Sequence, residues 1–182
     1  MAEAKIGVKE LGGGALLLKA FEKADARGDF RKYFERSLLE RLSFSVDEVF
    51  ISANRKGVFR GMHYQEPCPQ KKIVWCVKGK VFDVLLDMRK SSPGCGKWVG
   101  VELSQANGKG VYIPEGFAHG FLSLEEDSRV LYVISGEQKP ECERGVKYDD
   151  PEVGIKLPDA GVKVILSERD AGFPGFSEAV KR

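Results

Sequence analysis

Short β-rich runs fill the chain from about residue 50 onward, and they constrain the fold more than any other feature. The stretch KIVWCVKGKVFDVLLDM holds two such runs that meet at Lys78 and Gly79, which is typical of a β-hairpin. Four more runs follow, namely KWVGVEL, GVYIP, HGFLSL and SRVLYVIS. Strands that recur about every 8–12 residues predict an all-β sandwich or small barrel. No helical periodicity interrupts them, so βαβ units are not expected.

The second run of the hairpin alternates between two faces, as a strand does. One face carries Phe82, Val84, Leu86 and Met88, and the other carries Val81, Asp83, Leu85 and Asp87. If the second face lines a barrel, Asp83 is semi-buried and needs a partner.

The segments before and after this strand-rich region show helical, strand and loop patterns. GGGALLLKAF predicts a turn and then a strand, whereas DFRKYFERSLLERL predicts a helix with Asp29 as a suitable N-cap. That helix rests on the spacing of Phe30, Phe34, Leu38, Leu39 and Leu42. Near the C-terminus, YDDPEVGIKLPD predicts a loop, and VILSERDAGFPGF predicts a short strand followed by a polar loop. Because Val162, Ile165 and Leu166 need a core to bury against, we expect one domain over residues 1–182.

The composition argues against several classes of protein. The 182 residues are 42% hydrophobic, which is enough for a sizeable core and too high for disorder. The net charge is +2 with the signs interspersed, which does not suggest nucleic-acid binding. No run of about eighteen apolar residues is present, so no membrane span is expected. The N-terminus lacks the layout of a signal peptide, and we expect a cytoplasmic location.

Candidate metal ligands are few. The four cysteines, at positions 68, 76, 95 and 142, have no zinc-knuckle spacing, and we expect all four to be free thiols in a reducing cytosol. The two histidines, His63 and His119, are 56 residues apart. A cupin-type site needs about three histidines and a carboxylate. We therefore expect no metal.

His63 lies in GVFRGMHYQEPCPQKK, and three cations surround it in the sequence. Arg60 precedes it by three residues, and Lys71 and Lys72 follow. A single histidine near a strand is more often structural than catalytic. The cations fit either a solvated edge or an anion site, since guanidinium groups bind phosphate oxygens in pairs.

Three further residues have both a structural and a chemical interpretation. His119, in IPEGFAHGFLSL, is either a hydrogen-bonded barrel histidine or a functional group with Asp83 as its acidic partner. Tyr132, in RVLYVIS, is either a core residue or a general acid. Asp170, in LSERDAGF, could orient His63, although the sequence does not show that the two meet.

Six segments together resemble the nucleotide-sugar 3,5-epimerase family typified by dTDP-4-dehydrorhamnose 3,5-epimerase. They are ARGDFRKYF, KGVFRGMHYQEP, KKIVWCVKGKVFDVLLDMRKSSP, YIPEGFAHGFLSL, ECERGVKYDDPEVGI and ILSERD, in the order of the family. The resemblance implies a cupin-like jelly roll that is metal-free and forms a homodimer. It also implies epimerisation of a nucleotide-linked 4-keto-6-deoxyhexose at C3, C5 or both, through an enolate and without a redox cofactor.

The same resemblance implies roles for individual residues. His63 would be the base, Asp170 would orient it, Tyr132 would be the acid, and Lys72 would lie near the developing enolate oxygen. The implied substrate-binding residues are Arg27, Arg60, Asp83, His119, Gln138, Glu143 and Arg169. Arg27 and Arg60 are expected at the diphosphate.

Some positions depart from the family pattern. Gln138 stands where the family has an aromatic residue that stacks on thymine, and Glu48 and Phe50 stand where it has Gln and Asn. Lys32 replaces an expected acidic residue. The nucleotide base therefore stays open. Two alternatives also stay open: an epimerase acting at C3 alone or C5 alone, and a sugar-nucleotide binding module without turnover.

Overall fold

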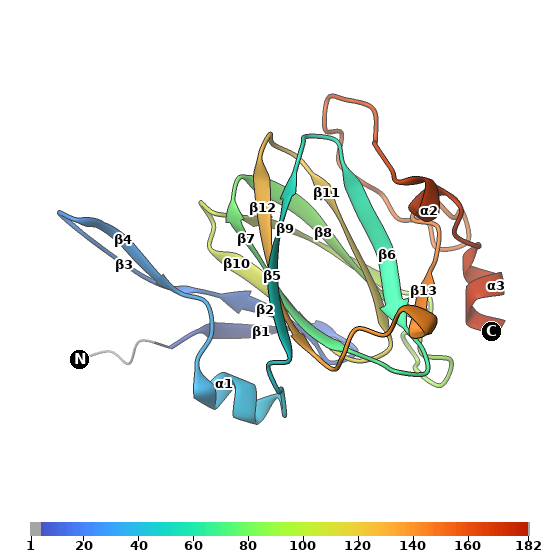
Figure 1. Ribbon diagram of the computed structural model, residues 1–182, viewed down its shortest axis with the longest axis horizontal. Coiled ribbons are helices and arrows are strands. Elements are labelled where there is room, and N and C mark those ends of the chain that lie inside the picture. The colour runs from blue at the N-terminus through green and yellow to red at the C-terminus, as the bar shows by residue number, and fades with distance from the viewer. Residues whose placement is uncertain (1–4, 182) are drawn as a thin grey trace.

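Two antiparallel sheets packed face to face form the body of the molecule (Figure 1). The computed structural model describes residues 5–181. The six-stranded sheet has the strand order β1 (Gly7–Gly12), β2 (Ala15–Lys19), β10 (Lys109–Ile113), β7 (Lys71–Lys78), β12 (Ser128–Ser135) and β5 (Glu48–Asn54). The five-stranded sheet has the order β13 (Glu143–Gly145), β6 (Phe59–Gln65), β11 (Phe117–Ser123), β8 (Lys80–Asp87) and β9 (Trp98–Ser104). The prediction of a mainly β, jelly-roll type of fold is confirmed.

The core has three layers because strands in the middle of each sheet are apolar on both faces. Between the sheets lie Val74, Val111 and Val130 from one sheet and Leu85 and Phe121 from the other. The outer face of the five-stranded sheet is covered by the C-terminal segment, and the outer face of the six-stranded sheet by the N-terminal segments. The alternation predicted for residues 81–88 is therefore correct, and the predicted hairpin turns at Gly79 between β7 and β8.

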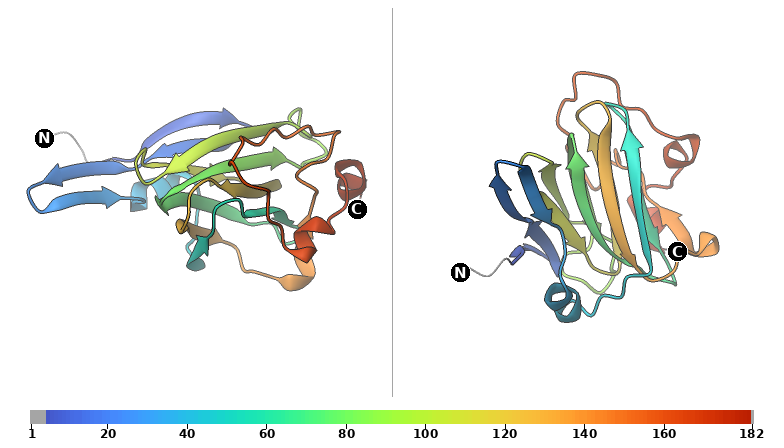
Figure 2. Two further views of the ribbon diagram at one scale, coloured as in Figure 1. Left: turned by 90° about the horizontal axis from the view of Figure 1, so that it is seen from above. Right: turned by 60° about the vertical axis from the view of Figure 1, so that its left-hand side comes forward.

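A projecting hairpin replaces the first part of the predicted helix. Strands β3 (Phe21–Asp25) and β4 (Gly28–Lys32) pair with each other and extend away from the body (Figure 2). Asp29 is thus a strand residue, and α1 (Arg36–Arg41) begins after Glu35. The apolar spacing was misleading because Phe30 is 61% exposed on the hairpin.

The C-terminal segment packs beside β6 and β13 (Figure 1). Its predicted strand is only a single bridge between Val58 and Ile165. The predicted polar loop contains α2 (Glu168–Ala171), and α3 (Phe176–Lys181) begins at its last residue. Leu166 packs on the core, whereas Val162 and Ile165 are exposed. One domain over residues 1–182 stays a prediction. No helix among residues 5–181 is long and apolar enough to cross a membrane.

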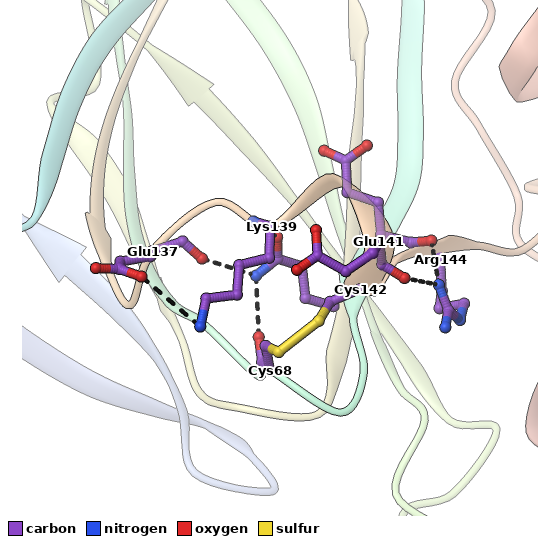
Figure 3. The surroundings of a disulfide bond; sticks show 8 residues. Cys68, Glu137, Lys139, Glu141, Cys142 and Arg144 are labelled. Atoms are coloured by element: carbon purple, nitrogen blue, oxygen red, sulfur yellow. Dashed lines mark hydrogen bonds and ion pairs between the residues drawn. A yellow bond between two sulfur atoms is a disulfide. The ribbon is translucent and has the colours of Figure 1, made fainter.

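A disulfide joins Cys68 to Cys142 (Figure 3). Their Cα atoms are 5.9 Å apart, although 74 positions separate them in the sequence. The pair forms because β13 lies alongside β6, which brings the 3-10 helix Pro140–Cys142 to the loop after β6. The prediction of four free thiols was wrong for this pair. Cys76 and Cys95 are free.

Candidate active site

A cavity of about 240 Å³ opens between the two sheets. Its walls come from β5, β7 and β12 of one sheet and from β6, β11 and β13 of the other. Eight of the eleven predicted site residues line it, namely Arg60, His63, Lys72, His119, Tyr132, Gln138, Glu143 and Arg169. The two predicted carboxylates Asp83 and Asp170 lie behind the histidines, and Arg27 lies elsewhere.

His63 and Asp170 form a hydrogen-bonded pair at one wall. His63 Nε2 is 2.9 Å from Asp170 Oδ1, and the amide of Gly61 donates to Asp170 Oδ2 at 3.1 Å. Ser167 caps α2 by accepting from the Asp170 amide, which fixes the carboxylate in place. Burial alone would raise the pKa of Asp170, but its hydrogen bonds to His63 and Gly61 outweigh burial and lower it. The ionised carboxylate favours the imidazole tautomer with its proton on Nε2, which leaves Nδ1 free to accept a proton.

A second histidine–aspartate pair lies deeper. His119 Nε2 is 2.9 Å from Asp83 Oδ2, and both side chains are almost completely buried. His119 stands directly opposite His63 in the pairing of β11 with β6. The partnership between His119 and Asp83 that was proposed from the sequence is therefore present in the structure.

Tyr132 faces the cavity from the opposite sheet. Its ring stacks on Phe50 with the centroids 4.8 Å apart and an interplanar angle of 16°. His119 contacts it edge-on at 5.9 Å. Burial and the nearby Asp83 carboxylate raise the pKa of Tyr132, and Arg60 only partly opposes them. The phenol therefore stays protonated over the physiological pH range and can donate a proton.

Lys72, on β7, is one of the cations that line the cavity. Burial lowers its pKa to about 8, and the negative charge of Glu143 limits the decrease. Among residues 5–181 its ammonium group has no hydrogen bond or ion pair. It can therefore interact with an anion that enters or forms in the cavity.

Polar groups at the mouth of the cavity are linked to one another. Glu143 pairs with Arg169 at 2.6 Å and accepts from the Gln138 side chain at 2.9 Å. The backbone amide of Gln138 donates to the Glu48 carboxylate at 3.0 Å. Burial would raise the pKa of Glu143, but the bonds from Gln138 and Arg169 outweigh burial and lower it. Glu143 is thus an anion held between two donors.

The two arginines expected at the diphosphate occupy different places. Arg60 lines the cavity, and its Nε donates to Asn54 at 2.7 Å. Arg27 lies at the tip of the β3–β4 hairpin, pairs with Asp25 and has a side chain that is 90% exposed. Within one chain the structure does not bring Arg27 to the other site residues.

Several contributors were not identified as site residues from the sequence. Phe50 was noted only as a departure from the family pattern, and Asn54 and Gln65 were not considered. The Gln65 side chain forms hydrogen bonds with the backbone of Cys68, Glu137 and Lys139 at the mouth of the cavity. Gln65 follows His63 by two positions on the same strand, so strand alternation could have placed it beside the cavity.

The described part of the chain has no group of three or more His, Cys, Asp or Glu side chains that could hold a metal ion. The cavity offers a free imidazole nitrogen from one sheet, and a protonated phenol and an ammonium group from the other. Such an arrangement can remove a proton from one side of a bound carbon acid and return one to the other side.

Comparisons with known proteins identify the family of this chain. Residues 12–178 match the family described as dTDP-4-dehydrorhamnose 3,5-epimerase. A relative of that name from Sinorhizobium fredii is 39% identical over 167 residues, covering 89% of this chain and 85% of the relative.

Two solved structures are also similar. The 3,5-epimerase RmlC of Legionella pneumophila, in complex with dTDP-4-keto-L-rhamnose, superposes with a TM-score of 0.90 at 34% identity, covering 95% of this chain and 94% of that one. ChmJ of Streptomyces bikiniensis, a 3'-monoepimerase in complex with dTDP-quinovose, gives a TM-score of 0.86 at 32% identity, covering 92% and 86%.

Proposed function

This chain belongs to the dTDP-4-dehydrorhamnose 3,5-epimerase family and is an isomerase of nucleotide-linked keto-deoxysugars, and we propose that His63 and Tyr132 are its base and acid. The observation that carries this assignment is the His63–Asp170 pair, at 2.9 Å, which faces the protonated Tyr132 across the cavity. The two groups come from opposite sheets. They can therefore act on opposite faces of one sugar ring.

The proposed reaction starts at a carbon next to the 4-keto group. His63 Nδ1 removes the proton from C3 or C5, and the electron pair of the C–H bond moves into the carbonyl to give an enolate. The Lys72 ammonium stabilises the negative oxygen. Tyr132 then donates its proton to the opposite face of the carbon, which inverts the centre. His63 then releases the proton it removed to solvent, and Tyr132 regains a proton from solvent, so the site is reset and no electrons are gained or lost overall.

The remaining predicted residues are proposed to hold the substrate. Arg60, Arg169 and Glu143 offer charged groups at the cavity, and His119 with Asp83 forms its deep wall. The nucleotide base is not part of the proposal, because Gln138 supplies an amide where an aromatic ring would stack.

We propose further that the protein is a cytoplasmic homodimer. Arg27 cannot serve the cavity of its own chain from the tip of a projecting hairpin, but it could serve that of a second copy. The hairpin exposes Phe30, and the edge strand β5 exposes Val49 and Ile51. Exposed apolar side chains on a projecting hairpin and on an edge strand offer surfaces that a second copy could cover.

The test is solvent exchange followed by NMR. The enzyme is incubated in deuterated buffer with nucleotide 4-keto-6-deoxyhexoses that differ in their base, and deuterium is followed at C3 and C5. We expect label and inversion with at least one donor, and His63→Ala should lower the exchange rate by about 10²-fold or more. The Cys95→Ser variant, changed at a free thiol that does not line the cavity, should exchange like the parent.

The outcomes separate the alternatives. Label at both carbons supports a double epimerase, and label at one carbon supports a monoepimerase. If the protein bound these nucleotide sugars but exchanged label into none of them, it would be a binding module and not an enzyme. Full exchange in His63→Ala would show that another group is the base.

A further inference from the structure

Within the part of the chain that the structure describes, no hydrogen bond fixes the hydroxyl group of Tyr132. Among residues 5–181 no donor or acceptor is paired with this oxygen. The direction of the phenol is therefore set by what touches its ring. Its aromatic contacts are the stack with Phe50 on one face and the edge contact with His119, and the Tyr132 side chain also packs against the core between the sheets.

The two contacts differ in how firmly they are held. His119 is fixed by its 2.9 Å bond to Asp83 and by its place in the middle of a buried strand. Phe50 comes from β5, at the edge of the six-stranded sheet, and stands directly opposite Tyr132 in the pairing of β5 with β12. Directly opposed residues on neighbouring strands are the closest side-chain pairs in a sheet. The stack is thus built into the register of these two strands.

We propose that Phe50 is a positioning residue that aims the Tyr132 hydroxyl at the enolate, so that it determines how often deprotonation leads to inversion. This inference rests on the proposed function. A ring stacked on one face of Tyr132 favours this orientation of the phenol and opposes a tilt of the side chain toward that face. Without Phe50, the phenol would no longer be held over the reacting carbon.

The position of the acid affects the product because His63 and Tyr132 deliver protons to opposite faces of the enolate. An enolate that receives no proton from Tyr132 can take one back from protonated His63, which regenerates the starting configuration. The His63 side chain is 37% exposed, so its proton can exchange with solvent before it returns. Loss of the positioned acid therefore produces solvent label in unreacted substrate. A substitution that merely loosens the fold would slow exchange and inversion together.

The experiment compares the rates of exchange and inversion in Phe50→Ala, Phe50→Leu and Phe50→Tyr. We expect the ratio of inversion to exchange to fall at least about tenfold in the Ala and Leu variants, within the contribution of a positioned general acid. Phe50→Tyr retains a ring and should keep the parental ratio. Tyr132→Phe gives the limit of exchange with little inversion. Val162→Ala is the control, because Val162 is an exposed apolar residue that lies outside both the cavity and the proposed contact between chains.

The Leu variant preserves most of the volume in case the Ala variant does not fold, which circular dichroism would show. An unchanged ratio in folded Phe50→Leu would overturn the proposal, and so would a parallel fall of both rates. Parental enzyme that shows no exchange with any donor would instead contradict the proposed function itself.

Discussion

The Lys72 ammonium group lies inside the cavity with a pKa of about 8, against an ordinary value of 10.5. Burial disfavours its charged form because the surrounding protein solvates the charge poorly. If the cation stabilises the enolate, its titration limits the reaction at alkaline pH. The folded state also loses this proton before the unfolded state does. The free energy of unfolding should therefore increase from about pH 8 to about pH 10.5.

We predict that kcat/KM decreases above about pH 8, by roughly tenfold for each further pH unit. Lys72→Arg keeps a cation well above that pH and should move this decrease to higher pH, even if its maximal rate is lower. Steady-state kinetics between pH 6 and about pH 10 would measure both profiles. A decrease at the same pH in both enzymes would assign it to another group.

The sequence alone could supply candidates for the site but not their geometry. The resemblance indicated His63, Tyr132 and Asp170, yet 107 residues separate His63 from Asp170, and only the folded chain brings them to 2.9 Å. Phe50 was seen as a departure and not as a contributor. Its role depends on the register of β5 against β12, which alternation of apolar residues does not specify when both faces of the strand are exposed.

At the scale of elements, the spacing between β6 and β11 is set by a glycine. Gly61 has φ +135°, and a Cβ atom there would overlap with Gly120 and lie 2.8 Å from the carbonyl oxygen of His119. The Gly61 amide also donates to Asp170. Both histidines of the site are on these two strands, so close backbone contact at Gly61 affects their separation.

We predict that Gly61→Ala decreases the free energy of unfolding by more than about 1 kcal/mol and also lowers solvent exchange at the substrate. Gly12→Ala is the matched control, because Gly12 also has a positive φ, of +112°, but nothing lies within 4 Å of its added methyl group. Denaturant unfolding and the NMR assay would be run on both. Equal losses of stability would mean that backbone strain, and not the approach of the strands, is responsible.

The elements were predicted best where the chain is buried on both faces. The strands from β7 to β12 follow the apolar runs because the apolar residues of both faces pack against a core cluster. The helix predicted over residues 29–42 was wrong for residues 29–32, which belong to strand β4 of the projecting hairpin. There the apolar Phe30 faces solvent, and cross-strand pairing of β3 with β4 decides the conformation. The spacing of apolar residues does not show whether they pack in the core of their own chain or lie on a surface that contacts another chain.

At the scale of the whole molecule, the β3–β4 hairpin projects away from the two sheets (Figure 1). Arg27 lies at the turn of this hairpin and does not line the cavity of its own chain. A role for Arg27 in substrate binding then requires a second copy. In a homodimer each cavity would combine His63 of one chain with Arg27 of the other. Activity would depend on assembly.

We predict that Arg27→Ala and His63→Ala, each poorly active alone, complement each other when they are produced together. Random pairing at equal amounts gives about half mixed dimers, each with one intact cavity, so about a quarter of all cavities would be functional. Exchange rates of the mixture and of each variant would be compared, with sedimentation to measure the assembly. If the mixture were no more active than each variant alone, Arg27 would not contribute to the cavity of a partner chain.

The Cys68–Cys142 bond has a consequence that is topological. It closes a covalent ring that contains every residue from 68 to 142, including strands β7 to β12. A single backbone cleavage inside this ring, for example in the exposed loop between β8 and β9, opens the ring but leaves both fragments attached through sulfur. Hydrolysis there would not release a fragment until a thiol reductant was added.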